Sequence, residues 1–258
     1  MMAEALISFP MYDWPEERAA IQGFWGNVRE ALVKQAPHLA LPDQYLSLSG
    51  DRLHDHWKSD HLLLSQSCWG PLTRGFDRYL LPIAQADYSS FEGGRGPYYR
   101  SAIVALAGQK EDVPETPAAS AFDHLISQKR LAFNDEMSLS GYLALVEDSS
   151  IASDHLRKAA TQTGSHRASL EAVRQGRADY AVIDCRSWAL AQKYDAASDQ
   201  LVVIGWTAER LGLPFVTSHK TPDDLKGVLQ QSLYERGCFP VPSSEPTLIY
   251  TPYLAPPS

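Results

Sequence analysis

The sequence predicts an α/β protein whose sheets are mostly parallel. Stretches with helical spacing of apolar residues alternate along the chain with short apolar runs of strand length, and this alternation favours parallel strands joined by helices. Residues 178–183 are almost continuously apolar, as in a strand covered on both faces. The 258 residues suffice for one large α/β domain or for two lobes of ordinary size.

In the first half of the chain, the pattern predicts a strand and then a long helix. Residues 5–11 are mostly apolar, and Pro10 interrupts the run. The helix that follows carries apolar residues at helical spacing, namely Ile21, Phe24, Trp25, Val28 and Leu32. The other expected elements are strands at 44–48, 61–66, 79–86, 98–107 and 130–134, helices at 51–58 and 122–126, and an exposed loop at 111–119.

The centre of the chain combines a turn, a helix and a buried strand with polar groups at both ends. Gly164 opens the turn, Ser165 is suited to cap the helix, and Gly176 is suited to end it in the left-handed conformation. Several backbone N–H groups converge at the N-terminus of a helix, so the turn that ends in His166 can bind an anion. Asp184 ends the strand, at the edge where open α/β sheets bind ligands.

Two apolar runs are the expected crossings between two lobes, residues 100–107 outward and 201–207 on the return. The sequence therefore predicts one lobe made of residues 1–101 and 208–258 and a second made of 102–207. The last elements expected are a helix at 188–194, extended stretches at 201–206 and 212–217, a helix at 223–236 and a proline-rich surface tail from 239.

Composition excludes several classes of protein. The formal net charge of −8 argues against nucleic acid and anionic membranes as partners, and no apolar stretch is long enough for membrane insertion. Glu4 interrupts a start that lacks basic residues, so no secretory leader is predicted and the chain as written is expected in the cytoplasm, or in the periplasm if a leader has been removed. Cys68, Cys185 and Cys238 lack metal-ligand spacing and are interpreted as structural thiols.

Metal and hydrolase chemistry are weaker interpretations than anion binding. The His and Asp residues of 54–61 suggest a metal cluster, but residues two apart on a helix do not share a face. A triad of Ser165, His166 and Asp184 is disfavoured because sequence neighbours cannot easily serve as nucleophile and base. The sequence contains no nucleophile elbow and no phosphate-binding glycine loop, and it predicts no metal and no cofactor.

Four short motifs stand in a specific order along the chain. They are Tyr98-Tyr99-Arg100-Ser101, Ser138-Leu139-Ser140-Gly141, Gly164-Ser165-His166 and the run to Asp184. Together, from residue 8 to about 217, they resemble the phosphate/phosphite/phosphonate substrate-binding proteins of ABC transporters. The resemblance implies a type II periplasmic-binding-protein fold, in which two α/β lobes joined by a two-segment hinge hold a ligand in the cleft between them.

The resemblance also implies a set of site residues. In this family a Ser-x-Ser-Gly helix start and a His after Gly-x bind the oxyanion, which points to Ser138, Ser140 and His166. Asp184 is implied to face the ligand. The remaining expected ligand-binding residues are the aromatic residues Tyr12 and Tyr99 and the polar residues Gln66, Arg100, Asn134 and Ser165. The chain departs from the family at Leu139, where a hydroxyl residue is common.

The implied function is non-catalytic binding of a small oxyanion. The chain would act either as the substrate-binding component of an ABC transporter, with a possible permease partner, or as a cytoplasmic relative of that component. A carboxylate beside an anion is repulsive unless the ligand carries a proton or an amine, so phosphate, phosphite or an aminophosphonate is expected rather than sulfate. The alternative is an enzyme of thiamine-pyrimidine or menaquinone biosynthesis on the same fold, which should show a His or Cys cluster or an apolar cleft.

The site residues also have purely structural interpretations. Ser138 and Ser165 are suited to be ordinary helix caps. His166 is suited to a capping or surface position. Tyr99 and Arg100 fit equally well as ordinary strand residues.

Overall fold

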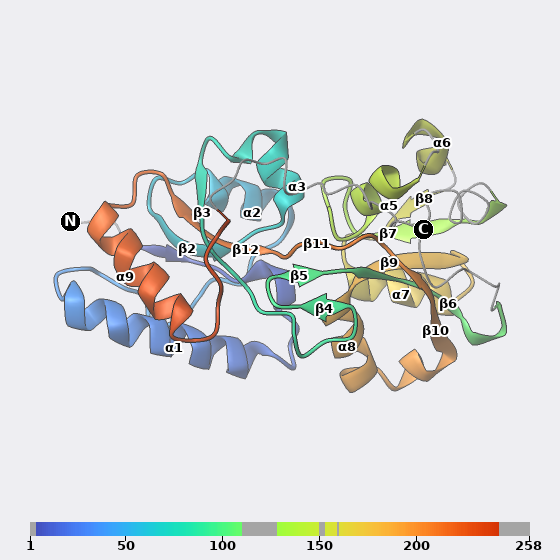
Figure 1. Cartoon of the computed structure of the whole chain (residues 1–258), viewed down its shortest axis with the longest axis horizontal. Coiled ribbons are helices and arrows are strands. Elements are labelled where there is room, and N and C mark those ends of the chain that lie inside the picture. Colours follow the sequence, from blue (N-terminus) through green and yellow to red (C-terminus); the bar gives the residue numbers. More distant parts are fainter. Residues whose placement is uncertain (1–3, 110–127, 150–152, 159, 243–258) are drawn as a thin grey trace, which may run out of the picture. The chain divides into compact units, whose positions relative to one another are not determined.

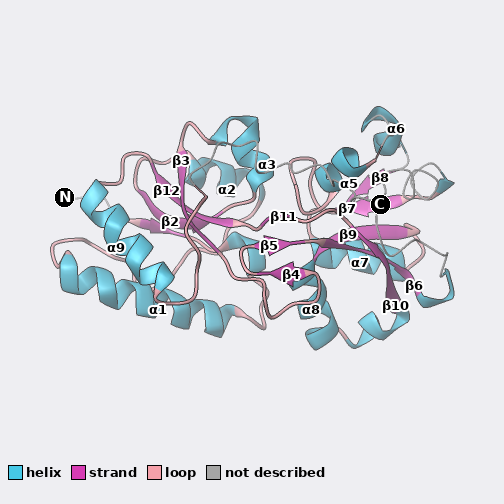
Figure 2. Cartoon of the chain, viewed as in Figure 1, coloured by secondary structure: helices cyan, strands magenta, loops and turns pink. Residues whose placement is uncertain are grey.

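The computed structural model describes residues 4–109, 128–149, 153–158 and 160–242. The described residues form two compact units, which Figures 1 and 2 show by chain position and by secondary structure. Unit 1 comprises the described parts of Met1–Asp87 and Gly212–Glu245, and unit 2 those of Tyr88–Leu211. The lobe boundaries expected from the sequence, after Ser101 and after Thr207, lie inside unit 2.

Unit 1 is built on a four-stranded sheet in the order β1-β2-β12-β3. Its strands are β1 (Leu6–Ile7), β2 (Leu62–Gln66), β12 (Pro214–Ser218) and β3 (Leu80–Gln85). β1 runs parallel to β2, whereas β12 is antiparallel to both β2 and β3. The helical segments of this unit are η1 (Pro10–Tyr12), α1 (Arg18–Gln35), α2 (Gly50–Trp57), α3 (Trp69–Pro71), η2 (Leu72–Phe76) and α9 (Asp223–Tyr234).

Helical periodicity in the sequence accounts for the packing of unit 1. α1 buries Ile21, Trp25, Val28 and Leu32 on one face, as its apolar spacing predicts, and it lies beside α9 (Figure 1). The expected helix at 51–58 is confirmed as α2, whose Leu53 and Trp57 point inward. These two side chains join a core cluster with Leu62, Leu72, Leu80 and Val216.

Unit 2 contains a five-stranded sheet in the order β10-β6-β9-β7-β8 and a small three-stranded sheet in the order β11-β5-β4. The strands of the larger sheet are β6 (Ser101–Leu106), β7 (Leu131–Phe133), β8 (Ala160–Gln162), β9 (Tyr180–Asp184) and β10 (Leu201–Trp206). The smaller sheet consists of β4 (Gly94–Arg95), β5 (Tyr98–Tyr99) and β11 (Arg210–Leu211).

Helices α7 and α8 pack against the large sheet of unit 2 (Figure 2). The helical segments of this unit are η3 (Ala107–Gln109), α5 (Tyr142–Asp148), α6 (Ser153–Lys158), α7 (His166–Arg174), α8 (Cys185–Tyr194) and η4 (Ala196–Gln200). Gly176 follows α7 with a φ of +68°, the left-handed conformation that the sequence predicts there.

The prediction of mostly parallel sheets is wrong, because the sheets are mixed. In unit 2, β7 is parallel to β8 and β9, but β6 is antiparallel to β9 and β10. Alternation of helices and strands implies parallel pairing only where a helix connects strands on one sheet. β6 instead follows the β4–β5 hairpin, and that route into the sheet carries no signal in the sequence pattern.

Other differences from the expected elements are local. The expected strand at 5–11 shortens to β1, because the chain turns into η1 at Pro10. The expected strand at 44–48 contributes only a single bridge between Ser8 and Leu46. The segments 111–119 and 122–126 and most of the tail lie outside the described residues. Within the part of the chain that the structure describes, no helix combines the length and apolar character needed to cross a membrane.

Candidate functional site

Strand polarity in unit 2 brings several polar residues to one edge of the large sheet. Asn134 follows β7 and Asp184 ends β9, and these two strands are parallel. Because β6 runs antiparallel to β9, its first residue, Ser101, pairs with Asp184. His166 begins α7 just beyond the same edge, where the backbone N–H of Gly164 donates to the Asn134 carbonyl at 3.0 Å.

The segment between β7 and α5 folds into a compact loop that holds two buried serines. The Asp135 carboxylate accepts a hydrogen bond from the Met137 N–H at 2.8 Å, and the Ser138 carbonyl accepts one from the Leu143 N–H at 3.1 Å. A Cβ at Gly141 would lie 2.5 Å from Asn134 Oδ1, so glycine allows this close approach. α5 starts at Tyr142 without a side-chain cap, so Ser138 is not a plain helix cap.

Five side chains form a hydrogen-bonded group that we call the polar cluster, consisting of Asn134, Ser138, Ser140, His166 and Asp184. Ser138 Oγ lies 3.1 Å from Ser140 Oγ and accepts from Asn134 Nδ2 at 3.0 Å. Ser140 Oγ lies 3.0 Å from His166 Nε2, which is 3.3 Å from Asp184 Oδ2. The sequence names all five residues, and the structure brings them together.

The imidazole of His166 and the carboxylate of Asp184 are both buried, with side chains that are 10% and 2% exposed. Burial lowers the pKa of His166 below its usual value, and the nearby Asp184 carboxylate and Val182 carbonyl oppose this effect only in part. Burial therefore favours the neutral form of the His166 imidazole. Asp184 has a second partner, because its Oδ1 accepts a hydrogen bond from the Ser187 N–H at 2.9 Å and caps α8.

This arrangement does not match a hydrolytic triad. In such a triad, the serine and the aspartate bond to different ring nitrogens of the histidine. Here Ser140 Oγ and Asp184 Oδ2 both lie beside the same nitrogen, Nε2 of His166. The cluster instead offers two hydroxyl groups, an amide and an imidazole, which together can donate several hydrogen bonds to an oxyanion at the start of α7.

The sequence of residues 77–237 matches the protein family described as "ABC transporter, phosphonate, periplasmic substrate-binding protein". The chain belongs to this family. The match covers more than half of the sequence, including the whole polar cluster, and it confirms the resemblance inferred from the short motifs. No curated protein matches the chain significantly.

Solved structures show the same fold at low sequence identity. PhnD1 from Prochlorococcus marinus, in complex with methylphosphonate, is 16% identical with a TM-score of 0.65, and the match covers 89% of this chain and 83% of PhnD1. A binding component of an ABC phosphonate transporter from Pseudomonas aeruginosa is 16% identical with a TM-score of 0.62, covering 89% and 74%. A histidine kinase sensor domain with similarity to periplasmic binding proteins is 12% identical with a TM-score of 0.59, covering 90% and 89%. The chain therefore has a periplasmic-binding-protein-like α/β fold.

The other residues that the sequence assigns to a phosphonate-family site lie outside the polar cluster. Ser165 Oγ accepts a hydrogen bond from the Ala168 N–H at 3.1 Å, so its hydroxyl caps α7. The ring of Tyr99, in β5, stacks on Tyr88 with centroids 5.3 Å apart. Arg100 follows β5, where its N–H donates to the Gly93 carbonyl at 2.7 Å. Tyr12 in η1 and Gln66 at the end of β2 are buried residues of unit 1.

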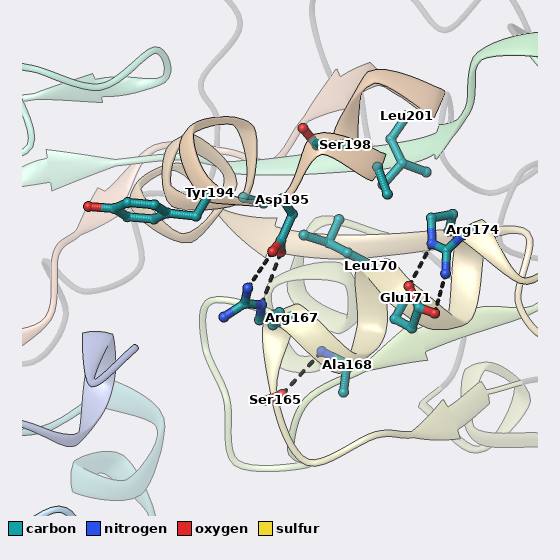
Figure 3. A pocket seen from close by; sticks show the side chains of 13 residues that line it. Ser165, Arg167, Ala168, Leu170, Glu171, Arg174, Tyr194, Asp195, Ser198 and Leu201 are labelled. Carbon is teal, nitrogen blue, oxygen red and sulfur yellow. Dashed lines mark hydrogen bonds and ion pairs between the residues drawn. The ribbon is translucent and has the colours of Figure 1, made fainter. Parts of the chain in front are cut away.

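A cavity of about 610 Å³ lies between α7, α8 and η4, and Figure 3 shows its lining. Ser165 is the one predicted site residue among its lining residues. The two guanidinium groups in the wall are paired with carboxylates, Arg167 with Asp195 and Arg174 with Glu171 (Figure 3). Because these charges neutralise each other, the polar cluster is the better candidate for an anion site.

Sequence reasoning did not assign a site role to Ser101. Its hydroxyl donates to the Ser140 carbonyl at 3.0 Å, and its N–H donates to Thr207 Oγ1 at 2.8 Å. A serine at the start of an apolar run has no distinctive pattern, although Ser101 is part of one of the family motifs. Only the antiparallel placement of β6 shows that it reaches the polar cluster.

Proposed function

We propose that this chain binds a small oxyanion of the phosphate or phosphonate class on the polar cluster of unit 2. The observation that carries the proposal is the convergence of Ser138, Ser140, Asn134 and His166 in a member of the phosphonate-binding family. This proposal implies a non-catalytic role. The chain would act either as the binding component of an ABC transporter, with a permease as partner, or as a cytoplasmic relative of such a component. PhnD1, which shares the fold, was solved with methylphosphonate.

The chemistry of the cluster favours an oxyanion that carries a proton or an amine. Hydroxyl groups both donate and accept, so Ser138 and Ser140 can adapt to a protonated or an unprotonated oxygen. Asp184 can only accept while it is ionised, and a fully deprotonated anion beside it is repelled. Monohydrogen phosphate, phosphite and aminophosphonates therefore fit the cluster, whereas sulfate does not.

A ligand panel tests the proposed function directly. Inorganic phosphate, phosphite, methylphosphonate and 2-aminoethylphosphonate are titrated into the protein by calorimetry and thermal unfolding, with sulfate as the matched control. Binding to the folded state alone stabilises it by about 2.7 kcal/mol at a ligand concentration of 100 Kd. We expect this stabilisation with at least one phosphorus oxyanion and none with sulfate. A protein that binds none of the phosphorus compounds refutes the proposed function.

Replacing Ser140 with Ala is expected to weaken binding of the phosphorus oxyanion by about 1–3 kcal/mol, because a hydrogen bond to a charged ligand is lost. Calorimetry of the variant measures the change. The control is Ser89→Ala, which removes an exposed hydroxyl that accepts from the Gly96 N–H elsewhere in unit 2. Equal affinities in wild type and Ser140→Ala would remove Ser140 from the site.

Replacing Asp184 with Asn is expected to lower the ratio of phosphate affinity to sulfate affinity by about tenfold or more. A tenfold change corresponds to about 1.4 kcal/mol of binding free energy. The substitution keeps the shape, removes the negative charge and preserves an oxygen that can cap α8. Competition binding of phosphate and sulfate to both proteins measures the ratio. If Asp184 acts only as the α8 cap, the variant changes stability and leaves the phosphate-to-sulfate ratio unchanged.

A further inference from the structure

Ser101 occupies an enclosed position beside the polar cluster, and each of its polar atoms has a partner. The residue is 1% exposed. Its N–H donates to Thr207 Oγ1 at 2.8 Å, and its carbonyl accepts from the Thr207 N–H at 2.9 Å. The remaining polar atom, Oγ, donates to the Ser140 carbonyl at 3.0 Å.

The position of Ser101 in the sheet links it to a second member of the cluster. Ser101 is the register partner of Asp184 across the β6–β9 pair. Ser101 therefore lies next to the strand that ends in Asp184, and it also donates a hydrogen bond to the loop that carries Ser140. Its backbone is fixed from the other side by Thr207, which is itself 1% exposed.

We infer that Ser101 is a positioning residue of the oxyanion site, which acts by fixing the main chain at Ser140. This inference rests on the proposed function. The carbonyl and the hydroxyl of Ser140 belong to one residue, so a shift of the peptide unit moves Oγ away from Ser138 and His166. Binding groups must be held within about 0.5 Å of the productive geometry by their supporting contacts. Ser101 supplies such a contact without facing the ligand itself.

The test compares Ser101→Ala with Ser101→Thr, using inorganic phosphate and methylphosphonate as probes in calorimetry. Ser101→Ala removes the donor to the Ser140 carbonyl and is expected to weaken binding of the better probe about tenfold, whereas Ser101→Thr keeps the hydroxyl and is expected to restore binding to within about threefold. Two variants of Thr207 form a second pair. Thr207→Val removes the oxygen that accepts from the Ser101 N–H, whereas Thr207→Ser retains it.

A matched control separates positioning from stability. Thr217→Val removes a fully buried hydroxyl in unit 1 that donates to the Leu63 carbonyl at 2.8 Å. This variant is expected to lower the melting temperature and leave the Kd of the probe unchanged. If Ser101→Ala and Thr207→Val lower the melting temperature in the same way with unchanged Kd, Ser101 is merely structural and the inference is wrong. If wild type binds neither probe, phosphite and 2-aminoethylphosphonate replace them; a wild-type protein that binds none of the four compounds refutes the proposed function, and this inference with it.

Discussion

Replacing Arg210 with Met is expected to lower the free energy of unfolding by about 3–5 kcal/mol, because it leaves a buried carboxylate without its partner. The Arg210 side chain is 6% exposed, and that of Asp148 is 11% exposed. The guanidinium binds Asp148 through both terminal nitrogens and also donates to the Ala208 carbonyl at 2.8 Å and the Ala144 carbonyl at 3.3 Å. Once the guanidinium is gone, the one hydrogen bond that Asp148 keeps among the described residues comes from the Ala208 N–H, at 2.7 Å.

Urea unfolding of three variants measures this effect. Arg210→Met gives the full cost, and the double variant Arg210→Met/Asp148→Leu is expected to recover more than half of it, because the unpaired buried charge is removed as well. The control is Arg95→Met, which breaks an exposed pair with Glu209 and is expected to cost less than about 1 kcal/mol. An Arg210→Met variant that is no less stable than Arg95→Met would contradict the prediction.

Arg210 also illustrates which parts of the fold the sequence does not reveal. The helices α1, α2 and α9 were predictable, because their apolar spacing is local and reports directly which face is buried. The partner of Arg210 lies 62 positions away, and their contact depends on the placement of β11 beside β5. Strand pairing of this kind is a long-range property, so the prediction of mostly parallel sheets was wrong for the same reason.

The polar cluster was easier to predict than its supports. The family resemblance implied Ser138, Ser140 and His166, and the positions of His166 at a helix start and Asp184 at a strand end also pointed to a site from the pattern alone. Ser165 was named for the same reason, but its hydroxyl is used as the helix cap that its residue type favours. Ser101 was not named as a site residue, because its role depends on which strand lies beside β9 and in which direction.

A second large effect is expected from pH, through His56 in unit 1. This residue lies in α2 and is 7% exposed. Among the described residues, no group hydrogen-bonds to its Nε2. Burial lowers the pKa of His56 to about 4, whereas a histidine in an unfolded chain has a pKa of about 6.5. Between these two values the unfolded chain binds a proton that the folded protein does not, so the free energy of unfolding falls as the pH is lowered.

The size of the effect follows from the difference between the two pKa values. Each pKa unit is worth about 1.36 kcal/mol, so wild type should lose about 3 kcal/mol of stability through His56 between pH 7 and pH 4, and the loss from this residue levels off below its folded-state pKa. Glutamine does not titrate, so the His56→Gln variant should not lose this free energy. Between pH 7 and pH 4 its free energy of unfolding should fall by about 3 kcal/mol less than that of wild type. Contributions from other groups, including buried His166, are common to both proteins and cancel in the difference. His61→Gln, which removes an exposed imidazole just before β2, serves as the matched control. Urea unfolding at a series of pH values decides the matter, because curves for wild type and His56→Gln that stay parallel from pH 7 to pH 4 would show that His56 does not carry the effect.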